Sequence, residues 1–451
     1  MEFEIALKLV EQLVQEKTGK PLLDVEKVVF QGAWEGLTYD QIAEQSSNYE
    51  ANYLKGDVGP NFWKLLSEVF GEQVSKRNVR AVLEKWEKQP QPTLPVAKTA
   101  FTQIPEEKNQ PRDDWGYAPD VSNFCGRTEE LNTLKRWIVE EKCRMVGILG
   151  LGGMGKTTLA VRMGEQVKGE FDRCIYRVLR ETYAFDKFLG DLPTFLTGSS
   201  PQNTEEDVYD KILRLIDGLR QYRCLLILDN LEAILQPGDR FGRYRTGFEA
   251  YGQLFKKVGE VAHQSCLVVV SREKFPECDR LRNFNQAVKS LELKGLKLEE
   301  VQELLQNTNL TGESQHWQGL IERYSGMPLA LKLIAPTIQE FFAQDVAKFL
   351  KDSQTIYLDP EYRHILAWHW ERLSHSEKKV LRILAEADRP ISFSELRDRM
   401  PDYSMSDLIE SLNSLKGRSL LEKSESPDNE QSRFGLQPVI QKYINKYQLG
   451  S

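Results

Sequence analysis

The sequence predicts a multidomain protein of the α/β class with further all-α domains. Short apolar runs alternate with helical patterns in the middle of the chain, a glycine-rich loop follows the first of these runs, and amphipathic helical patterns occupy both ends. Strands that alternate with helices are typical of a parallel sheet covered by helices. The expected organisation is a helical domain over 1–88, a linker over 89–118, a parallel-sheet domain over 119–296, a helical domain over 297–350 and a last domain over 351–446.

The composition is that of an ordinary globular protein, with 40% hydrophobic and 28% charged residues and a formal net charge of −7. This charge balance gives no overall attraction to nucleic acid or to an anionic membrane. The longest strongly apolar runs, Cys224–Leu228 and Cys266–Val270, are far shorter than the roughly 20 residues of a membrane span. Six scattered cysteines without a CxxC pair are expected for buried thiols in a reducing compartment. We therefore expect a cytoplasmic location and no membrane partner.

The first block of the chain carries helical patterns throughout. Apolar residues recur on one helical face near the N-terminus, and Thr38 with Gln41 forms a capping-box pattern ahead of a further helix. Five prolines then interrupt residues 89–118, and this composition favours an extended, exposed connection.

The middle and last blocks differ in their patterns. Ser374 and Glu377 form a capping box in the last block, which continues with helical patterns and two strand patterns separated by the turn-rich stretch SESPDNEQS. Three helices and a hairpin predict a winged helix over 351–446. The strand-like runs of the middle block are Arg144–Leu149, Cys174–Leu179, Cys224–Leu228, Cys266–Val270 and Val288–Leu293.

The glycine-rich loop Gly150-Leu-Gly-Gly-Met-Gly-Lys156-Thr157 fits the pattern GxxxxGK[ST]. Its glycines let backbone N–H groups turn toward phosphates, and the helix that comes next adds its partial positive charge. The pattern predicts ATP or ADP with Mg²⁺ as ligand, Lys156 on the β- and γ-phosphates, and the Thr157 hydroxyl on the metal ion. The candidate binding residues of the loop are Gly152, Gly153, Met154, Gly155, Lys156, Thr157 and Thr158.

Two later strand patterns end in charged residues. Asp229 ends the run CLLILD and is predicted as a magnesium ligand, and Arg272 ends VVVSR, where it can contact a γ-phosphate. Asn230 cannot act as a base because an amide takes no proton, so Glu232 is the nearest carboxylate able to polarise a water. Each residue also has a plain structural interpretation, as a strand-end cap, a solvated residue at a helix start or a surface arginine.

These features together resemble the NB-ARC family of STAND switch ATPases, which includes plant disease-resistance receptors, the animal apoptosome scaffold and many bacterial regulators. The resemblance covers about 120–445 and rests on GLGGMGKTTLA, LLILDN and VVVSR. SGMPLAL resembles the family motif whose proline packs on the adenine, which implies that role for Pro328. NFCGRTE resembles the family's VGR-x-E motif, which implies that Phe124, Cys125 and Arg127 lie beside the adenine and ribose.

The chain departs from the family pattern at two places. Asp229-Asn230 stands where the family usually has two aspartates, so the resemblance implies slow ATP hydrolysis or a reaction that uses Glu232. Leu436-Gln437-Pro438 stands where the family has Met-His-Asp, whose histidine contacts the β-phosphate of ADP. Gln437 is therefore expected at that phosphate, where it can donate a hydrogen bond but carries no charge.

In the first block, residues 34–80 read WEGLTYDQIAEQSSNYEANYLKGDVGPNFWKLLSEVFGEQVSKRNVR. This stretch resembles an N-terminal helix-turn-helix domain of bacterial conflict-system proteins of the vWA-MoxR-associated kind. Residues 1–90 hold 11 Lys and Arg against 15 Asp and Glu, and the segment expected to read bases, Asn48–Lys55, holds one Lys and one Glu. Because phosphate contacts dominate DNA affinity, this charge disfavours DNA and favours a protein partner, although both interpretations stay open.

The leading functional hypothesis is a switch that is closed with ADP and self-associates or signals with ATP, in bacterial defence or signal transduction. Its enzymatic activity would be a slow ATPase reaction. The alternative is an ATP-dependent transcriptional regulator that binds DNA through the first block. A metabolic P-loop kinase is disfavoured, because the sequence shows no site for an acceptor substrate.

Overall fold

The chain forms two units, Met1–Pro105 and Glu106–Ser451, which are described separately. The computed structural model describes residues 3–18, 22, 24–46, 54–70, 72–87, 112–180, 185, 188, 192, 207–352, 356–387, 389–425 and 432–449. Among these residues, no helix combines the length and the apolar character needed to cross a bilayer.

The first unit is a helical domain around an aromatic core, as expected. Phe30 and Phe62 meet edge-on in this core and are fully buried. The capping box is confirmed, since the Thr38 N–H donates to Gln41 Oε1 at 2.8 Å and the Gln41 N–H to Thr38 Oγ1 at 3.2 Å. The elements are α1 (Phe3–Thr18), α2 (Asp24–Trp34), α3 (Tyr39–Ser46), η1 (Leu54–Val58), α5 (Gly59–Phe70) and α6 (Val79–Glu87).

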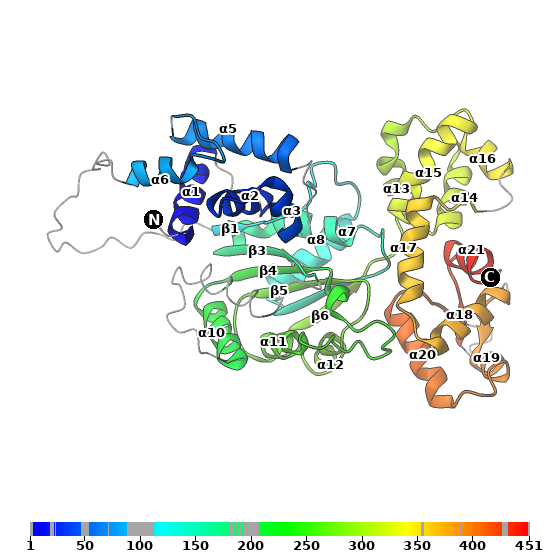
Figure 1. Cartoon of the computed structure of the whole chain (residues 1–451). Helices are drawn as coiled ribbons and strands as arrows, with labels where there is room; N and C mark the ends of the chain where they lie inside the picture. Colours follow the sequence, from blue (N-terminus) through cyan, green and yellow to red (C-terminus); the bar gives the residue numbers. More distant parts are fainter. Residues whose placement is uncertain are drawn as a thin grey trace. The chain divides into compact units, whose positions relative to one another are not determined.

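The second unit is built on a parallel sheet whose six described strands follow the order β1-β3-β4-β5-β2-β6 (Figure 1). The five expected strands are all confirmed to within one residue at each end. The strands are β1 (Arg112–Asp114), β2 (Met145–Leu149), β3 (Arg173–Val178), β4 (Cys224–Asp229), β5 (Cys266–Ser271) and β6 (Val288–Glu292). β1 was not expected: its charged sequence lies inside the predicted linker, and pairing with the edge of β3 makes it a strand.

Helices cover both faces of this sheet, which explains why β2, β4 and β5 are buried along their whole length. Successive side chains of β5 point to opposite faces, so Val268 packs in one apolar cluster and Val269 in the other. Figure 1 shows α7 and α8 on one face and α10, α11 and α12 on the other. Their bounds are Thr128–Lys135 for α7, Lys156–Val167 for α8, Val208–Gln221 for α10, Glu249–Glu260 for α11 and Pro276–Phe284 for α12. Short π or 3₁₀ turns are η2 (Arg136–Glu140), η3 (Lys168–Glu170) and η4 (Leu231–Ile234).

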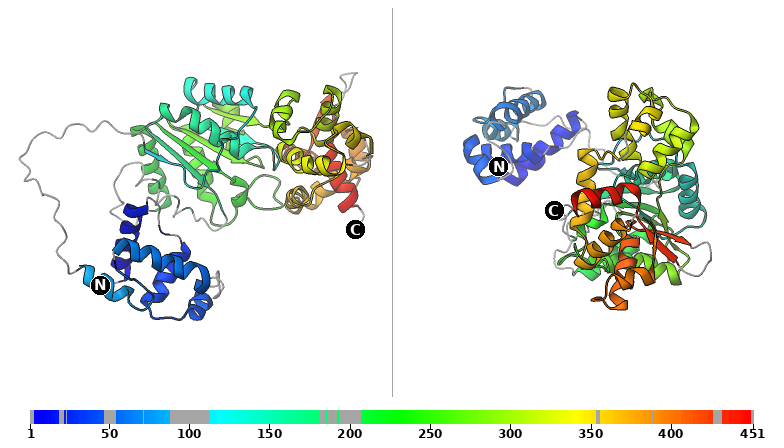
Figure 2. Two further views of the ribbon diagram at one scale, coloured as in Figure 1. Left: turned by 90° about the horizontal axis from the view of Figure 1, so that it is seen from above. Right: turned by 90° about the vertical axis from the view of Figure 1, so that its right-hand side faces the viewer.

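The segment after the sheet is helical, as the sequence predicts for 297–350. The left view of Figure 2 shows these helices and the C-terminal ones gathered at one end of the sheet. The elements are α13 (Leu298–Leu304), η5 (Gln306–Thr308), α14 (Ser314–Tyr324), α15 (Pro328–Phe341) and α16 (Val346–Asp352).

The C-terminal segment, residues 356–449, combines helices with a small antiparallel sheet of three described strands in the order β7-β9-β8. The capping box of Ser374 and Glu377 is confirmed at the start of α18. Ile391 and Ser392 pair with β9, and Ser392 caps a helix that begins at Phe393. The elements are α17 (Pro360–Glu371), α18 (His375–Glu386), β7 (Ile391–Ser392), α19 (Phe393–Asp398), α20 (Met405–Gly417), β8 (Glu422–Glu425), β9 (Ser432–Gly435) and α21 (Pro438–Tyr447).

Helix α8 packs closely against the sheet at Gly164. A Cβ added there would lie 2.7 Å from the Trp115 ring and 2.9 Å from the side chain of Ile227. We expect Gly164→Ala to lower the free energy of unfolding by about 1 kcal/mol or more, because overpacking costs about 1–3 kcal/mol and outweighs the gain in helix propensity. Denaturant unfolding measures this change. Gly169→Ala is the control, because a Cβ at Gly169 meets nothing within 4 Å, and an equal loss in both variants would contradict the prediction.

Candidate functional site

The glycine-rich loop joins β2 to α8, and three of its glycines have a positive φ angle. Gly150, Gly153 and Gly155 have φ values of 147°, 85° and 85°. L-residues with a side chain rarely adopt this backbone, so the glycines permit the turn. Gly152 is required for another reason: a Cβ added there would lie 2.7 Å from Ile365 Cγ2 of α17. The conformation of the loop and its close contact with α17 therefore both require glycine.

Lys156 begins α8 and is buried beneath the loop. Its Nζ donates a hydrogen bond of 2.7 Å to the Leu151 carbonyl oxygen. Burial lowers the pKa of Lys156 to about 8, although the nearby Glu232 carboxylate opposes this shift. An ammonium group with a neutral carbonyl as partner has hydrogen-bonding capacity left for an anion.

The predicted phosphate residues meet in one cavity of about 360 Å³. It is lined by loop residues, by the end of β4 and by the end of β5. The structure thus brings together residues separated by more than a hundred positions in the sequence. The lining residues are Gly152, Gly153, Gly155, Lys156, Thr157, Thr158, Asp229, Asn230, Glu232, Val270 and Arg272.

Asp229 is held from several sides at the end of β4. Tyr176 on β3 donates its hydroxyl to Asp229 Oδ2 at 2.8 Å, and the Asn230 N–H donates to Oδ1 at 2.8 Å. Burial raises the pKa of the Asp229 carboxyl, while hydrogen bonds from Thr157 and Tyr176 oppose the rise. Sequence reasoning missed Tyr176, although a tyrosine two residues before the end of a buried strand could have suggested a polar partner in a neighbouring strand.

Glu232 and Arg272 form an ion pair in the lining of the cavity. The Arg272 N–H donates to Glu232 Oε2 at 3.0 Å, and Arg272 Nε lies 3.0 Å from Oε1. Glu232 is only 2% exposed, so it is not the solvated residue that the sequence left as an alternative. Asn230 also lines the cavity, and its Nδ2 donates to the Leu179 carbonyl oxygen at 3.0 Å.

Helix α17 of the C-terminal segment closes one side of the glycine-rich loop. The Gly152 N–H donates to His369 Nε2 at 3.1 Å, and Ile365 packs on the same glycine. Burial and the nearby Arg272 and Lys156 charges lower the pKa of His369 well below its ordinary value, so the imidazole is neutral and can accept this bond. None of the α17 residues was singled out from the sequence.

The residues expected at the adenine and ribose line a second cavity of about 170 Å³. Met154, Gly155 and Thr158 also line it, and Gly155 and Thr158 are shared with the phosphate cavity. Lys332 of α15 joins this lining and was not anticipated. The predicted residues found here are Phe124, Cys125, Arg127, Met154, Gly155, Thr158 and Pro328.

Arg127 has a structural role as well. It is 4% exposed, its Nη1 pairs with Glu130 Oε1 at 2.8 Å, and its Nη2 donates to the Met154 carbonyl oxygen at 3.3 Å. Its backbone N–H donates to Glu300 at the start of α13. Arg127 therefore ties the segment before α7 to both the glycine-rich loop and the helical segment.

Gln437 lies apart from both of these cavities. It precedes α21 and lines a third cavity of about 690 Å³, which also includes Met154 and Ser325. Its buried Oε1 has no hydrogen-bond partner among the described residues. The sequence resemblance implied that Gln437 is the residue of the C-terminal segment that contacts a phosphate. In the structure, the residue of this segment that contacts the glycine-rich loop is His369.

The residues present fit a nucleotide with Mg²⁺. The glycines of the loop line the cavity together with the buried Lys156 ammonium, and the hydroxyl of Thr157 meets the Asp229 carboxylate. Hydroxyl and carboxylate oxygens are the ligands that Mg²⁺ prefers.

Two family descriptions match this chain. Residues 1–86 match the vWA-MoxR associated protein N-terminal HTH, and residues 127–233 match the NB-ARC domain. An uncharacterized WD repeat-containing protein of Nostoc sp. is 39% identical over 350 residues, which cover 75% of this chain and 27% of that protein. A probable disease resistance protein of Arabidopsis thaliana is 29% identical over 120 residues, 25% of this chain and 12% of that protein.

The chain therefore spans little more than a quarter of the first of these relatives and less of the second. Among solved structures, a STAND protein with a tetratricopeptide repeat sensor from Pyrococcus horikoshii is 18% identical with a TM-score of 0.37, over 74% of this chain and 44% of that one. A Walker-type ATPase of Pyrococcus abyssi is 14% identical with a TM-score of 0.49, over 74% and 98%. At these scores the two structures add nothing to the fold described above. This chain therefore carries an NB-ARC domain over residues 127–233 and, over residues 1–86, the N-terminal helix-turn-helix domain of vWA-MoxR associated proteins.

Proposed function

We propose that this chain is a nucleotide-dependent switch that binds ATP or ADP with Mg²⁺. The observation that carries the proposal is the convergence of the glycine-rich loop, Lys156, Asp229 and Arg272 on one cavity. A P-loop, an acid at the end of one strand and an arginine at the end of the next supply the charges that a nucleoside triphosphate with a metal ion needs.

Each part of the nucleotide then has residues of matching chemistry. Lys156 and the N–H groups of the loop would hold the phosphates, while Thr157 and Asp229 would hold Mg²⁺. Arg272 would contact a γ-phosphate. Phe124, Cys125, Arg127 and Pro328 would enclose the adenine and ribose, because their cavity shares lining residues with the phosphate cavity.

The closed form would be the one in which α17 lies against the loop. In this proposal the C-terminal segment is a winged helix, which the helices α18, α19 and α20 and the sheet of β7, β9 and β8 support. The contacts of His369 and Ile365 with Gly152 hold it on the nucleotide domain. ADP is compatible with this packing, and ATP would loosen it and allow copies of the chain to associate. Gln437 lines a neighbouring cavity, which shares Met154 with the adenine cavity, so its predicted contact with a phosphate stays a prediction.

ATP hydrolysis would be slow and would use Glu232 as the base. Glu232 lies in the phosphate cavity, but both of its oxygens face Arg272. A carboxylate that is engaged by a guanidinium is a poor proton acceptor, so catalysis would require Arg272 to turn toward the γ-phosphate first.

The setting would be bacterial defence or signal transduction in the cytoplasm. Support comes from the relatives, one a WD repeat-containing protein and the others disease resistance proteins. The first unit would bind a protein partner. The alternative is that the first unit binds DNA, which its match to a helix-turn-helix domain favours. Ion pairs oppose this alternative because they neutralise two of its basic residues: Lys85 pairs with Glu72 at 2.8 Å and Arg80 with Glu84 at 3.3 Å.

Nucleotide binding is expected to depend on Lys156. Lys156→Ala removes a charge-assisted contact, and we expect it to weaken ADP binding roughly 10- to 150-fold. Isothermal titration calorimetry measures the affinity. Lys168→Ala, which removes an exposed lysine just beyond the other end of α8, is the matched control and should bind as the parent does. Unchanged ADP affinity in Lys156→Ala would refute the proposed site.

The hydroxyl of Tyr176 is expected to matter for magnesium, because it fixes the orientation of the Asp229 carboxylate. Partners of metal ligands typically change metal affinity about 10- to 100-fold, so Tyr176→Phe should need at least several-fold more Mg²⁺ to reach half-maximal tightening of ADP binding. Binding of ADP without Mg²⁺ should stay unchanged. Tyr324→Phe removes a hydroxyl bonded to the Tyr357 carbonyl oxygen and is the control. Equal Mg²⁺ requirements in both variants would argue against this role.

Hydrolysis is expected to depend on the carboxylate of Glu232. Glu232→Gln keeps the size of the side chain and removes its basicity, so steady-state turnover should fall by about 100-fold or more. ADP affinity, measured on the same preparation, separates loss of chemistry from loss of binding. If Glu232→Gln hydrolyses ATP at the parent rate, the base is another group.

A further inference from the structure

Helix α17 presents one stripe of side chains to the nucleotide domain. Ile365, Trp368, His369 and Arg372 follow the spacing i, i+3, i+4, i+7, which places them on one face of a helix. Ile365 and His369 contact Gly152, as described above. Arg372, the residue directly after α17, pairs through its Nε with Glu273 Oε1 at 2.5 Å. The stripe therefore touches the glycine-rich loop and the end of β5 at the same time.

Trp368 is flanked by two guanidinium groups. The centre of the Arg272 guanidinium lies 4.7 Å from the centroid of the Trp368 ring, and that of Arg372 lies 4.9 Å from it. Both distances are within the range of cation–π attraction, for which tryptophan is the most effective ring. Arg272 is thus held by two partners, the Glu232 carboxylate and the Trp368 ring.

Arg272 also forms the wall between two cavities. It lines the phosphate cavity, and it lines a further cavity of about 760 Å³ beside α17, together with His364, Trp368 and Arg372. Its side chain is 29% exposed, so it has room to move from one cavity toward the other. The same guanidinium can therefore serve a ligand in the phosphate cavity or the ring of α17.

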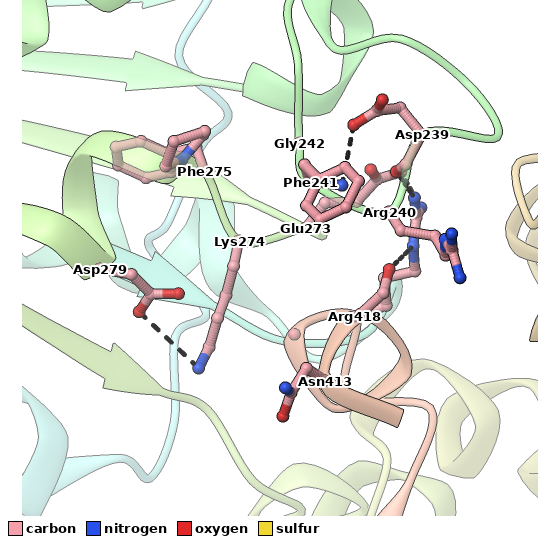
Figure 3. A pocket seen from close by; sticks show the side chains of 13 residues that line it. Asp239, Arg240, Phe241, Gly242, Glu273, Lys274, Phe275, Asp279, Asn413 and Arg418 are labelled. Carbon is pink, nitrogen blue, oxygen red and sulfur yellow. Dashed lines mark hydrogen bonds and ion pairs between the residues drawn. The ribbon is translucent and has the colours of Figure 1, made fainter. Parts of the chain in front are cut away.

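The backbone next to Arg272 is anchored to other elements, so the part of Arg272 that can move is its side chain. Glu273 is paired with Arg372 and, at 2.6 Å, with Arg418, and Figure 3 shows Glu273 and Arg418 side by side at the edge of a cavity. The Lys274 N–H donates to the Gly417 carbonyl oxygen at 3.1 Å. The end of β5 is thus anchored to α17 and α20.

We propose that Trp368 determines how strongly the site distinguishes a nucleoside triphosphate from a diphosphate, because its ring competes with the γ-phosphate for the guanidinium of Arg272. This inference rests on the proposed function, and it adds a specificity-determining residue from outside the nucleotide domain. A diphosphate leaves Arg272 on Glu232 and Trp368. A triphosphate gains a charge-assisted contact with Arg272 only after the stack with Trp368 has been broken.

The size of the effect depends on the strength of a cation–π contact. Converted to a ratio of affinities, breaking such a contact lowers the affinity for the triphosphate roughly 2- to 30-fold relative to the diphosphate. Trp368→Leu removes this penalty. It should therefore tighten binding of a non-hydrolysable ATP analogue by that factor and leave ADP affinity unchanged.

The experiment is a double-mutant cycle on the full chain, with calorimetric affinities for ADP and for the ATP analogue in the presence of Mg²⁺. The four proteins are the parent, Trp368→Leu, Arg272→Gln and the double variant. Trp370→Phe is the control: it lies on the same helix, but its ring faces Lys378 and Arg382 at 5.8 and 5.4 Å, away from Arg272. If Trp368→Leu does not fold, Trp368→Phe should show the same change with a smaller size.

The expected result is a higher ratio of triphosphate to diphosphate affinity in Trp368→Leu, no change in Trp370→Phe and no effect of Trp368→Leu in the Arg272→Gln background. An unchanged ratio overturns the proposal, as does an equal effect in the Arg272→Gln background, because the ring would then act without the arginine. If the parent binds neither nucleotide, the proposed function fails. If the parent binds both nucleotides but the ratio of their affinities is the same in Trp368→Leu, only the role of Trp368 fails.

Discussion

The packing of α17 on the glycine-rich loop depends on the absence of a side chain at Gly152. A Cβ there would meet Ile365 Cγ2, Arg272 Nη1 and His369 Nε2 within 3.2 Å. These three atoms belong to α17 and to the end of β5, so a methyl group at this position would require α17 or these side chains to shift. Gly152 is thus constrained by its neighbours, whereas Gly153 and Gly155 are constrained by their backbone angles.

The interface between the C-terminal segment and the end of β5, next to Gly152, contains buried charged residues. Glu273 is 2% exposed and meets both Arg372 and Arg418, while Arg272 on its other side meets Glu232. Buried ion pairs contribute little net stability compared with well-packed apolar residues, but breaking one by removing a partner costs about 3–5 kcal/mol. This asymmetry suits a switch. If the proposed switch opens this interface, each of these buried charges must acquire a new partner.

Much of the nucleotide domain was predictable, because its signals are local. Runs such as Cys266–Val270 have the length and apolar character of buried parallel strands, and the loop pattern requires a strand before it and a helix after it. The residues of the phosphate cavity were found for the same reason, since each lies in the loop or close to the end of a strand. Tyr176 and Trp368 were not found, because their importance arises from partners on other elements, and neither residue type signals a nucleotide site. Gln437 is the reverse case, a residue that was predicted from the sequence but that lines another cavity in the structure. A resemblance in sequence position placed it at a phosphate, but the path of the chain before α21 leads it into a different cavity.

The strand order has a consequence for how the protein is made. β2 carries the glycine-rich loop and lies between β5 and β6, both of which come more than a hundred residues later in the chain. On the ribosome, β2 has no neighbouring strand until residue 266 has emerged, and its second neighbour comes only with residue 288. Contacts at such long sequence separation form slowly and leave apolar strands exposed in the meantime. β2 and the glycine-rich loop that follows it therefore lack both of their neighbouring strands until the residues of β5 and β6 have been synthesised.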